Sequence, residues 1–470
     1  MQGKRARDST RMVHQPSLQL DLFDRPPRDG DHGGTAITDT GEGQVRAASE
    51  ASATLAQSLM EQLCLHENLR GAYERVKANR GAPGVDAMTV EELGPWLAAH
   101  EAELVDALFE GSYRPQSLRS VEIDKPGGGK RLLRIPTVID RLVQQAILQV
   151  LQPLFDPTFS ESSFGFRPGR SAHGALEQGQ SYVEAGYEMV VDMDLERFFD
   201  TVNQDRLMAL LARRITDKGL LGLIRQILRG GILDEGLQTV LGVPQGGPLS
   251  PLLSNVVLDE LDQELERRGH RFCRYADDCN IFVRTERAAE RVLASITDYV
   301  EGRLLLRVNR RKSAIGRSEE RTFLGHVITR KGLKLADKSL KRFKARIREI
   351  TSRNRGVSLG QVIAELNRYT QGWVGYFRYA QCRWVLRELD SWIRRKLRCY
   401  RLKQCNRVNA VRRFLQGLGV SRSAAWRLAR SGKGWWRKSI SPPAYWAMTN
   451  KWFKEQGLAG LEARHKALSH

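Results

Sequence analysis

Hydrophobic residues recur at helical spacing over much of this chain, and shorter stretches alternate bulky with polar residues as strands do. The first helical pattern begins near Thr54 and ends at the glycine- and proline-containing loop 81–84. Further helices are predicted over residues 90–100, 140–151, 172–179, 205–213, 220–228, 252–266, 288–301, 340–350, 359–368 and 385–397. Strands are predicted over residues 118–123, 131–135, 189–195, 272–275, 281–283, 304–308 and 323–328. Because the pattern is purely helical from residue 337 onward, we expect an α+β fold followed by an all-α region.

The first 53 residues differ from the rest. They are rich in Gly, Asp, Arg, Ser and Thr and have few apolar positions, so we expect a disordered or weakly ordered leader. A chain of 470 residues is too long for one ordinary hydrophobic core, which favours two or three domains.

A hairpin carries the most informative acids. Strand-forming residues 272–275 and 281–283 flank Ala276, Asp277 and Asp278, which predicts a tight turn with two adjacent carboxylates. Such a pair is by itself more often a polar turn. If both charges are held rigidly and partly buried, however, they need a partner. A hard divalent cation such as Mg²⁺ fits, because it shares few protein oxygens with phosphates and water.

A second acidic segment can complete that set. The apolar stretch 189–191 leads into Asp192 and Asp194, which are two residues apart and therefore point to one face of a strand. Either could supply a third carboxylate opposite the turn.

Two glycine-rich segments suit a nucleotide. Residues 125–130 form a glycine turn between lysines, and such a basic hairpin can close over a triphosphate. Residues 242–251 are the densest Gly/Pro segment and lead into a helix, where free backbone N–H groups can approach a nucleotide or template.

Charge is concentrated near the C-terminus. The chain has a net charge of +21, and residues 331–440 alone hold 29 Lys and Arg against 5 Asp and Glu, a net of +24. Eight of the nine Trp residues also follow residue 331. Interleaved cations and aromatic rings indicate a nucleic-acid surface, with a merely solvated basic face as the alternative.

Composition also argues against other classes of protein. The six Cys residues form no Cys-x-x-Cys pair, so we expect free thiols in a reducing cytoplasm and no zinc site. There is no apolar run of membrane-spanning length and no signal-peptide pattern, so we expect no membrane partner.

Taken in order, the motifs resemble those of reverse transcriptases encoded by bacterial group II introns. The resemblance covers most of residues 60–400 and rests on Gly81-Ala82-Pro83-Gly84-Val85-Asp86, residues 125–145, Asp194-Leu195-Glu196-Arg197-Phe198-Phe199-Asp200, Gly242-Val243-Pro244-Gln245-Gly246-Gly247, Tyr275-Ala276-Asp277-Asp278, Phe323-Leu324-Gly325 and Gly372-Trp373 with Tyr376-Phe377. It implies a right-hand polymerase with fingers and an antiparallel palm sheet (54–335), an all-α thumb or maturase domain (336–405) and a basic helical DNA-binding region (406–470).

The resemblance also assigns roles to individual residues. Asp194, Asp277 and Asp278 would bind two Mg²⁺ ions and carry catalysis, with Asp192 left as a supporting or structural acid. Four residues would bind the nucleotide: Lys125 and Arg131 at the triphosphate, Phe199 under the sugar and Gln245 at the incoming nucleotide. Phe199 could instead be a core aromatic. Arg141 and Lys312 are candidate primer or template contacts.

The implied function is RNA-directed DNA polymerisation, target-primed on DNA, together with splicing of the host intron. Its partners would be intron RNA, an RNA template, a DNA target or primer and deoxynucleoside triphosphates; the oligomeric state stays open, a dimer included. No Cys/His cluster follows Trp452, so we expect no endonuclease. Two alternatives remain: a splicing factor without polymerase activity, and a reverse transcriptase domesticated for defence, repair or diversity generation.

Overall fold

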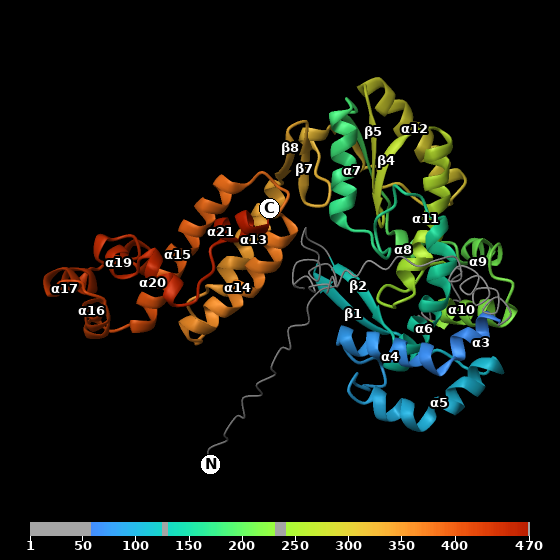
Figure 1. The fold of residues 1–470 in the computed structure, drawn as a ribbon, viewed down its shortest axis with the longest axis horizontal. Coiled ribbons are helices and arrows are strands. Elements are labelled where there is room, and N and C mark those ends of the chain that lie inside the picture. Colours follow the sequence, from blue (N-terminus) through green and yellow to red (C-terminus); the bar gives the residue numbers. More distant parts are fainter. Residues whose placement is uncertain (1–57, 125–129, 231–240, 469–470) are drawn as a thin grey trace, which may run out of the picture. The chain divides into compact units, whose positions relative to one another are not determined.

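The computed structural model describes residues 58–124, 130–230 and 241–468. These residues form two compact units, an N-terminal unit that ends at Leu324 and a C-terminal unit that begins at Gly325 (Figure 1). The predicted leader, residues 1–53, lies outside the described residues.

A four-stranded antiparallel sheet organises the N-terminal unit. Its spatial order is β4-β5-β3-β6, with bounds β3 Met189–Asp194, β4 Arg271–Tyr275, β5 Asp278–Val283 and β6 Ala314–Arg317. Helices α7 (Ala172–Glu184) and α12 (Glu286–Gly302) pack against this sheet (Figure 1). The predicted acidic hairpin is confirmed, since β4 and β5 pair directly across residues 276–277.

Helix α6 (Val138–Phe155) contacts α3, α4 and α11. Thr137 caps α6 by accepting from the backbone N–H of Asp140 at 3.1 Å, which explains why the helix begins earlier than predicted. The hairpin β1–β2 pairs Arg119–Asp124 with Lys130–Ile135. The other helices are α3 Leu59–Cys64, α4 His66–Asn79, α5 Leu93–Phe109, α8 Phe198–Thr201, α9 Gln204–Ala212, α10 Lys218–Gly230 and α11 Ser250–Arg267, with single 3₁₀ turns at Asp156–Thr158 and Ser318–Glu320.

Two predicted strands were wrong in extent. Residues 304–308 make only an isolated bridge between Val308 and Leu195, because Leu305 adopts a left-handed φ of 57° that interrupts an extended run. The strand predicted over 323–328 begins only at His326, since Leu324 and Gly325 both have positive φ.

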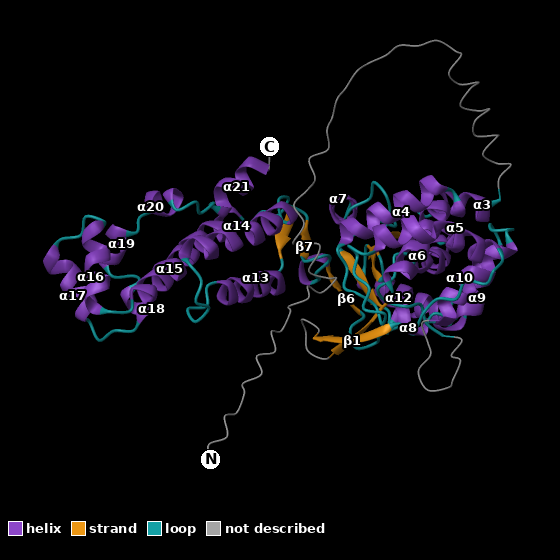
Figure 2. Ribbon diagram, turned by 90° about the horizontal axis from the view of Figure 1, so that it is seen from below, coloured by secondary structure: helices purple, strands orange, loops and turns teal. Residues whose placement is uncertain are grey.

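The C-terminal unit is almost entirely helical (Figure 2). A short hairpin, β7 His326–Thr329 with β8 Gly332–Leu335, precedes α13 Asp337–Ile350, α14 Leu359–Tyr376, α15 Arg383–Cys405, α16 Val408–Gly417, α17 Arg422–Arg430, α18 Trp435–Lys438, α19 Pro442–Ala447, α20 Asn450–Glu455 and α21 Leu461–Leu468. The Gly372–Phe377 motif lies within and at the end of α14, where Trp373 packs on Phe343 with ring centroids 4.3 Å apart. The unit thus has its own aromatic core.

The fold class predicted from the sequence is confirmed: helices mixed with antiparallel sheets, followed by a helical C-terminal region. Among the described helices, none combines the length and the apolar character that crossing a membrane demands.

Candidate active site

Three acids share one face of the palm sheet. In the β3–β5 register, Asp194 lies directly opposite Asp278 and Asp192 lies opposite Asn280. Opposed residues of antiparallel neighbours point to the same face, and so do residues two apart on one strand. Asp192, Asp194 and Asp278 therefore converge, while Asp277 sits in the adjoining turn.

The acids repel one another. Desolvation, followed by repulsion from the carboxylates of Asp192, Asp277 and Asp194, raises the pKa of Asp278 well above its ordinary value. Desolvation also raises the pKa of Asp192, with a smaller contribution from Asp194 and an opposing one from Arg321. A bound cation would favour the charged forms of Asp278 and Asp192, whose pKa values are raised.

Asp194 is the acid that already faces a cation. Its Oδ2 accepts a hydrogen bond from Lys312 Nζ at 3.1 Å. Lys312, the predicted primer or template contact, therefore pairs with a residue that is predicted to bind metal. The backbone N–H of Asp194 donates to Ser313 Oγ at 3.0 Å, and its carbonyl accepts from Asn309 N at 2.8 Å. Sequence reasoning had not singled out Asn309 or Ser313, whose polar side chains in a basic loop carry no distinctive signal.

The turn that presents Asp277 is strained. Ala276 adopts a φ of 59°, a left-handed conformation that a residue with a Cβ visits at a cost of about 1–2 kcal/mol. The loop before α7 approaches so closely that a Cβ on Gly165 would lie 2.2 Å from Ala276 N. Close packing of this loop against the turn therefore helps to maintain the strained conformation of Ala276.

Arg274 supplies much of that hold. It is fully buried, and all five of its N–H donors have acceptors. Nη1 donates to Ala276 O at 3.0 Å, and Nε donates to Asp262 Oδ1 at 2.7 Å. The remaining acceptors are Asn255 Oδ1 at 2.9 Å, Ser163 Oγ at 2.7 Å and Asp262 Oδ2 at 2.5 Å from Nη2.

This network, which we call the Arg274 strut (Arg274, Asp262, Asn255 and Ser163), links α11 to the acidic turn. Asn255 also donates to Gly165 O at 2.9 Å, so one side chain joins the strut to the loop beneath the turn. Sequence reasoning missed the strut. The available signal was an aspartate within the apolar stripe of α11, beside Leu261 and Leu265.

The glycine-rich loop 242–249 lies against the β1–β2 hairpin and α6. The carbonyl of Gln245 accepts from Arg134 N at 3.0 Å, and a Cβ on Gly247 would lie 2.0 Å from Gln144 Oε1. Phe199, at the start of α8, is partly exposed and packs edge-on against Phe198 at 5.4 Å. The backbone of Val243 donates to Phe199 O at 2.7 Å, which brings the predicted nucleotide residues Phe199 and Gln245 into one region.

The remaining predicted residues are Arg141, Arg131 and Lys125. Arg141 is buried, and its Nη2 donates to Ala82 O at 2.7 Å, so it connects α6 to the loop 81–86. Arg131 lies on β2 opposite Ile123. Lys125 lies outside the described residues.

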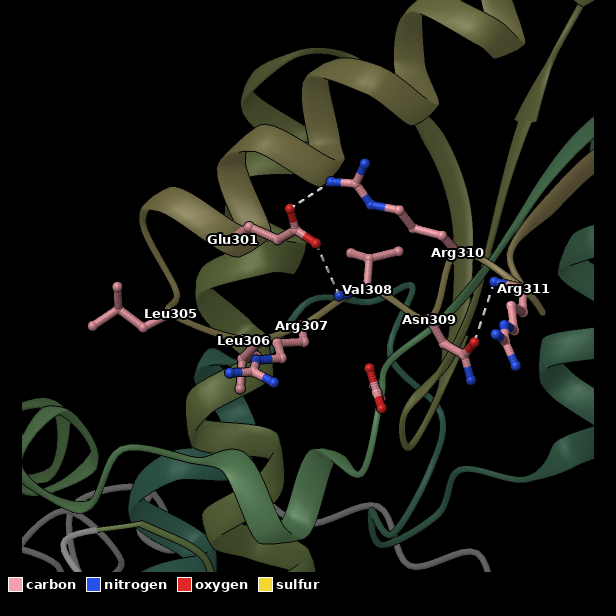
Figure 3. A pocket seen from close by; sticks show the side chains of 9 residues that line it. Glu301, Leu305, Leu306, Arg307, Val308, Asn309, Arg310 and Arg311 are labelled. Atoms are coloured by element: carbon pink, nitrogen blue, oxygen red, sulfur yellow. Dashed lines mark hydrogen bonds and ion pairs between the residues drawn. The ribbon is translucent and has the colours of Figure 1, made fainter.

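A hollow of about 830 Å³, lined by three arginines and two glutamates among others, borders the loop that carries Asn309 (Figure 3). Arg310 turns toward Glu301 on α12 and donates to Glu301 Oε2 at 2.8 Å, while Arg307 and Arg311 also line the space. The backbone N–H of Glu196 donates to Arg307 O at 2.8 Å, which ties this wall to the end of β3. Arg310 is thus paired with an acid, while Arg307 and Arg311 suit phosphate groups.

The acids fit a hard divalent cation by their chemistry. Within the three described ranges, no three His, Cys, Asp or Glu side chains are gathered tightly enough to hold a metal ion as they lie. Yet Asp278 lies near three other carboxylates. The ammonium group of Lys312 forms an ion pair with Asp194, which shows that this group of acids accommodates a positive charge. An all-oxygen set of this kind suits Mg²⁺.

Comparison with known proteins agrees with this geometry. Residues 123–328 match the family described as reverse transcriptase (RNA-dependent DNA polymerase), and residues 340–418 match the group II intron maturase-specific domain. The chain is 33% identical over 328 residues to Protein YkfC of Escherichia coli (strain K12), which covers 61% of this chain and 86% of that protein. It is 34% identical over 195 residues to the Group II intron-encoded protein LtrA of Lactococcus lactis subsp. cremoris, covering 41% of this chain and 32% of that one.

Among solved structures, a partial Cas6-RT-Cas1–Cas2 complex matches at 26% identity and a TM-score of 0.34, covering 52% of this chain and 43% of that chain. Telomerase from Candida albicans, with a fragment of telomeric RNA, matches at 13% identity and a TM-score of 0.38, covering 72% and 70%. The chain spans about a third of the length of LtrA and most of the length of YkfC.

The palm sheet, its acids and the two matched families define a reverse transcriptase joined to a maturase-specific domain. The chain belongs to the family of group II intron-encoded reverse transcriptases and maturases, as the order of its sequence motifs predicted.

Proposed function

We propose that this protein copies RNA into DNA by target-primed synthesis and also assists splicing of its intron RNA. The observation that carries the proposal is the convergence of Asp192, Asp194 and Asp278 on one sheet face, with Asp277 in the adjoining turn. A merely structural sheet gains nothing from gathering carboxylates that raise one another's pKa.

Asp194, Asp277 and Asp278 would hold two Mg²⁺ ions. Bound divalent ions would supply Lewis-acid activation of the primer 3′-hydroxyl and would neutralise charge on the leaving pyrophosphate. The protein's own contribution is positional. The β3–β5 register sets the separation of Asp194 from Asp278, and the Arg274 strut holds the turn that carries Asp277.

Residues around the acids would orient the nucleotide. Lys125 and Arg131 would bind the triphosphate, Gln245 the incoming nucleotide, and the ring of Phe199 would lie under the sugar and oppose a 2′-hydroxyl. Lys312 would release Asp194 and contact primer or template once the site is loaded; its present ion pair supports a place beside the reacting strand. Arg141 would then act through the loop that it fastens.

Splicing assistance needs no further chemistry from the protein. Basic helices of the maturase-specific region and of residues 406–470 would brace the intron RNA, and the latter region would bind the DNA target. The net charge of +24 over residues 331–440 supports this role. Because its partners would be RNA and DNA, the protein would be located in the bacterial cytoplasm in association with nucleic acid.

Primer extension on an RNA template with Mg²⁺ tests the polymerase. Asp277→Ala should lower extension by at least about 10³-fold, because it removes a ligand rather than a binding surface. Asp298→Ala, an exposed acid on α12, is the matched control and should extend normally. RNA affinity should be unchanged in both variants.

The same experiment separates the alternatives. If the native chain makes no cDNA but accelerates splicing of its flanking RNA, the splicing-factor alternative replaces the polymerase. If cDNA is made and splicing is unaffected, a domesticated reverse transcriptase is favoured.

A further inference from the structure

A second hollow lies wholly within the C-terminal unit, with a volume of about 430 Å³. Four separate helices enclose it: the start of α14, the end of α15, α16 and α20. Its lining residues are Ser358, Leu359, Arg401, Gln404, Phe414, Trp452 and Gln456. The volume falls within the range of small-molecule pockets.

Aromatic rings and one cation form the body of this hollow. Phe414 and Trp452 meet edge to face with centroids 6.4 Å apart, and both rings are only partly buried. The guanidinium of Arg401 lies over the Phe414 ring at 4.5 Å. A partly exposed indole such as that of Trp452 can stack on a planar ligand, and the Arg401 guanidinium beside it adds positive charge.

The polar groups of the hollow suit hydrogen bonding to a flat heteroaromatic ring. Gln404 Nε2 donates to Val357 O at 2.9 Å, which leaves its amide oxygen as an acceptor. Gln456, at the end of α20, brings a second amide with both a donor and an acceptor. Two amides can together match the edge of a nucleobase.

Among the described residues that line the hollow, none carries a carboxylate. Elsewhere in this unit arginines are paired with acids, as Arg355 is with Glu365 at 2.6 Å and Arg387 is with Glu462 at 2.8 Å. Within the part of the chain that the structure describes, Arg401 has no such acidic partner, so its charge is available to a phosphate.

We propose that this hollow receives an unpaired nucleobase of single-stranded nucleic acid. The base would stack on Trp452 beside Phe414, its edge would meet Gln404 and Gln456, and Arg401 would contact the adjoining phosphate. A base inside a duplex is stacked and paired and cannot enter, so the site selects single strands. The proposal rests on the proposed function, because it deepens how the maturase-specific region grips nucleic acid.

Equilibrium binding of four probes with equal phosphate counts tests this site. The probes are an adenine RNA 12-mer, the same length of DNA, a 12-mer backbone without bases, and a short blunt duplex. The native chain should bind the base-bearing single strands about 10-fold more tightly than the baseless strand, since stacking on one aromatic residue contributes that much. If RNA and DNA both bind more tightly than the baseless strand by the same factor, the hollow accepts bases of either nucleic acid. If only RNA binds more tightly, the hollow is specific for RNA.

Two variants connect the preference to the hollow. Trp452→Leu should reduce the roughly 10-fold ratio to about twofold, and Gln456→Ala, an exposed change that spares the core, should reduce it partway. Trp384→Leu is the matched control, because Trp384 is 67% exposed in the same unit and does not line the hollow. A thermal unfolding midpoint within a few degrees of native shows that each variant is folded.

Two results would overturn the inference: a native chain that binds baseless and base-bearing strands equally, or a Trp452→Leu chain that keeps the full ratio. If this happens while primer extension remains normal, the polymerase proposal survives alone. A native chain that neither binds single strands nor extends primers would remove both.

Discussion

Two charged sites, one in each unit, are arranged in opposite ways. In the N-terminal unit, Arg274 and Asp262 are both fully buried, and each neutralises the other within the protein. In the C-terminal unit, Arg395 lies 3.8 Å above the Trp436 ring, and Lys396 lies within reach of both Trp392 and Trp436. Desolvation, and then the nearby Arg348, lower the pKa of Lys396, as expected for a cation among cations.

The difference indicates what each unit is built to do. A buried, fully bonded pair cannot meet a partner, and its use is to fix geometry, here that of the acidic turn. Cations that lie over partly exposed rings place positive charge beside an aromatic surface, which suits a polyanion with bases. The first unit therefore positions chemistry, and the second presents a surface.

Breaking the Arg274 strut should give the largest loss of stability. Arg274→Met leaves Asp262 buried and unpaired, which should lower the free energy of unfolding by about 3–5 kcal/mol. Urea denaturation measures this, and primer extension should fall even where the variant is folded. The exposed pair offers the control: Arg225→Met, which faces Asp205 at 3.4 Å, should cost no more than about 1 kcal/mol.

Adding Asp262→Leu to Arg274→Met then separates stability from positioning. The double variant should regain much of the lost stability, because no buried charge remains in this pair. Its extension rate should stay low, since the side chain at position 274 no longer donates to Ala276 O. Recovery of both would show that the strut serves stability alone.

The carboxyl group of Asp259, in the N-terminal unit, should have a smaller and pH-dependent effect on the free energy of unfolding. Desolvation, and then repulsion by Asp262, raise the pKa of Asp259 from 3.8 to about 6. Because the folded-state pKa is raised, this carboxyl favours the fold below about pH 4, and that contribution is lost as the pH rises through about 6.

Asp259→Asn should therefore match the native chain near pH 4 and exceed its stability by about 2 kcal/mol at pH 7.5. Urea unfolding across this range measures the difference. Asp298→Asn, at an exposed position, should show no such divergence. A constant difference at every pH would mean that Asp259 titrates normally.

The smallest effect should come from the C-terminal cations. Replacing Arg395 or Lys396 by Gln should weaken single-strand binding several-fold and reduce the slope of log K against log salt by about 0.7 for each phosphate that the protein no longer neutralises. Arg383→Gln is the control from the same helix, because Arg383 already pairs with Glu462 at 3.0 Å. Equal slopes for all three variants would contradict the contrast between the units.

Much of the fold was predictable where a pattern was local. The acidic hairpin 272–283 and the strand 189–194 have β-forming residues around their acids, and both were predicted from the sequence. The segment 304–308 has the same apolar character but fails as a strand, because Leu305 adopts a left-handed φ of 57°. The strand propensity of the neighbouring residues does not predict such a conformation.

The sequence by itself determined the order of motifs, the acids at strand ends and the concentration of positive charge near the C-terminus, because each is a property of neighbouring residues. Only the tertiary structure decided which atoms meet. It placed Lys312 on Asp194, connected Arg141 to the loop 81–86 and set Arg274 beneath the turn with Asp262. It also brought Arg401, Phe414 and Trp452 together from three helices. Such contacts join residues that are far apart in the chain. Whether a charged side chain can bind a ligand or instead supports the fold depends on its burial, which the sequence alone does not show.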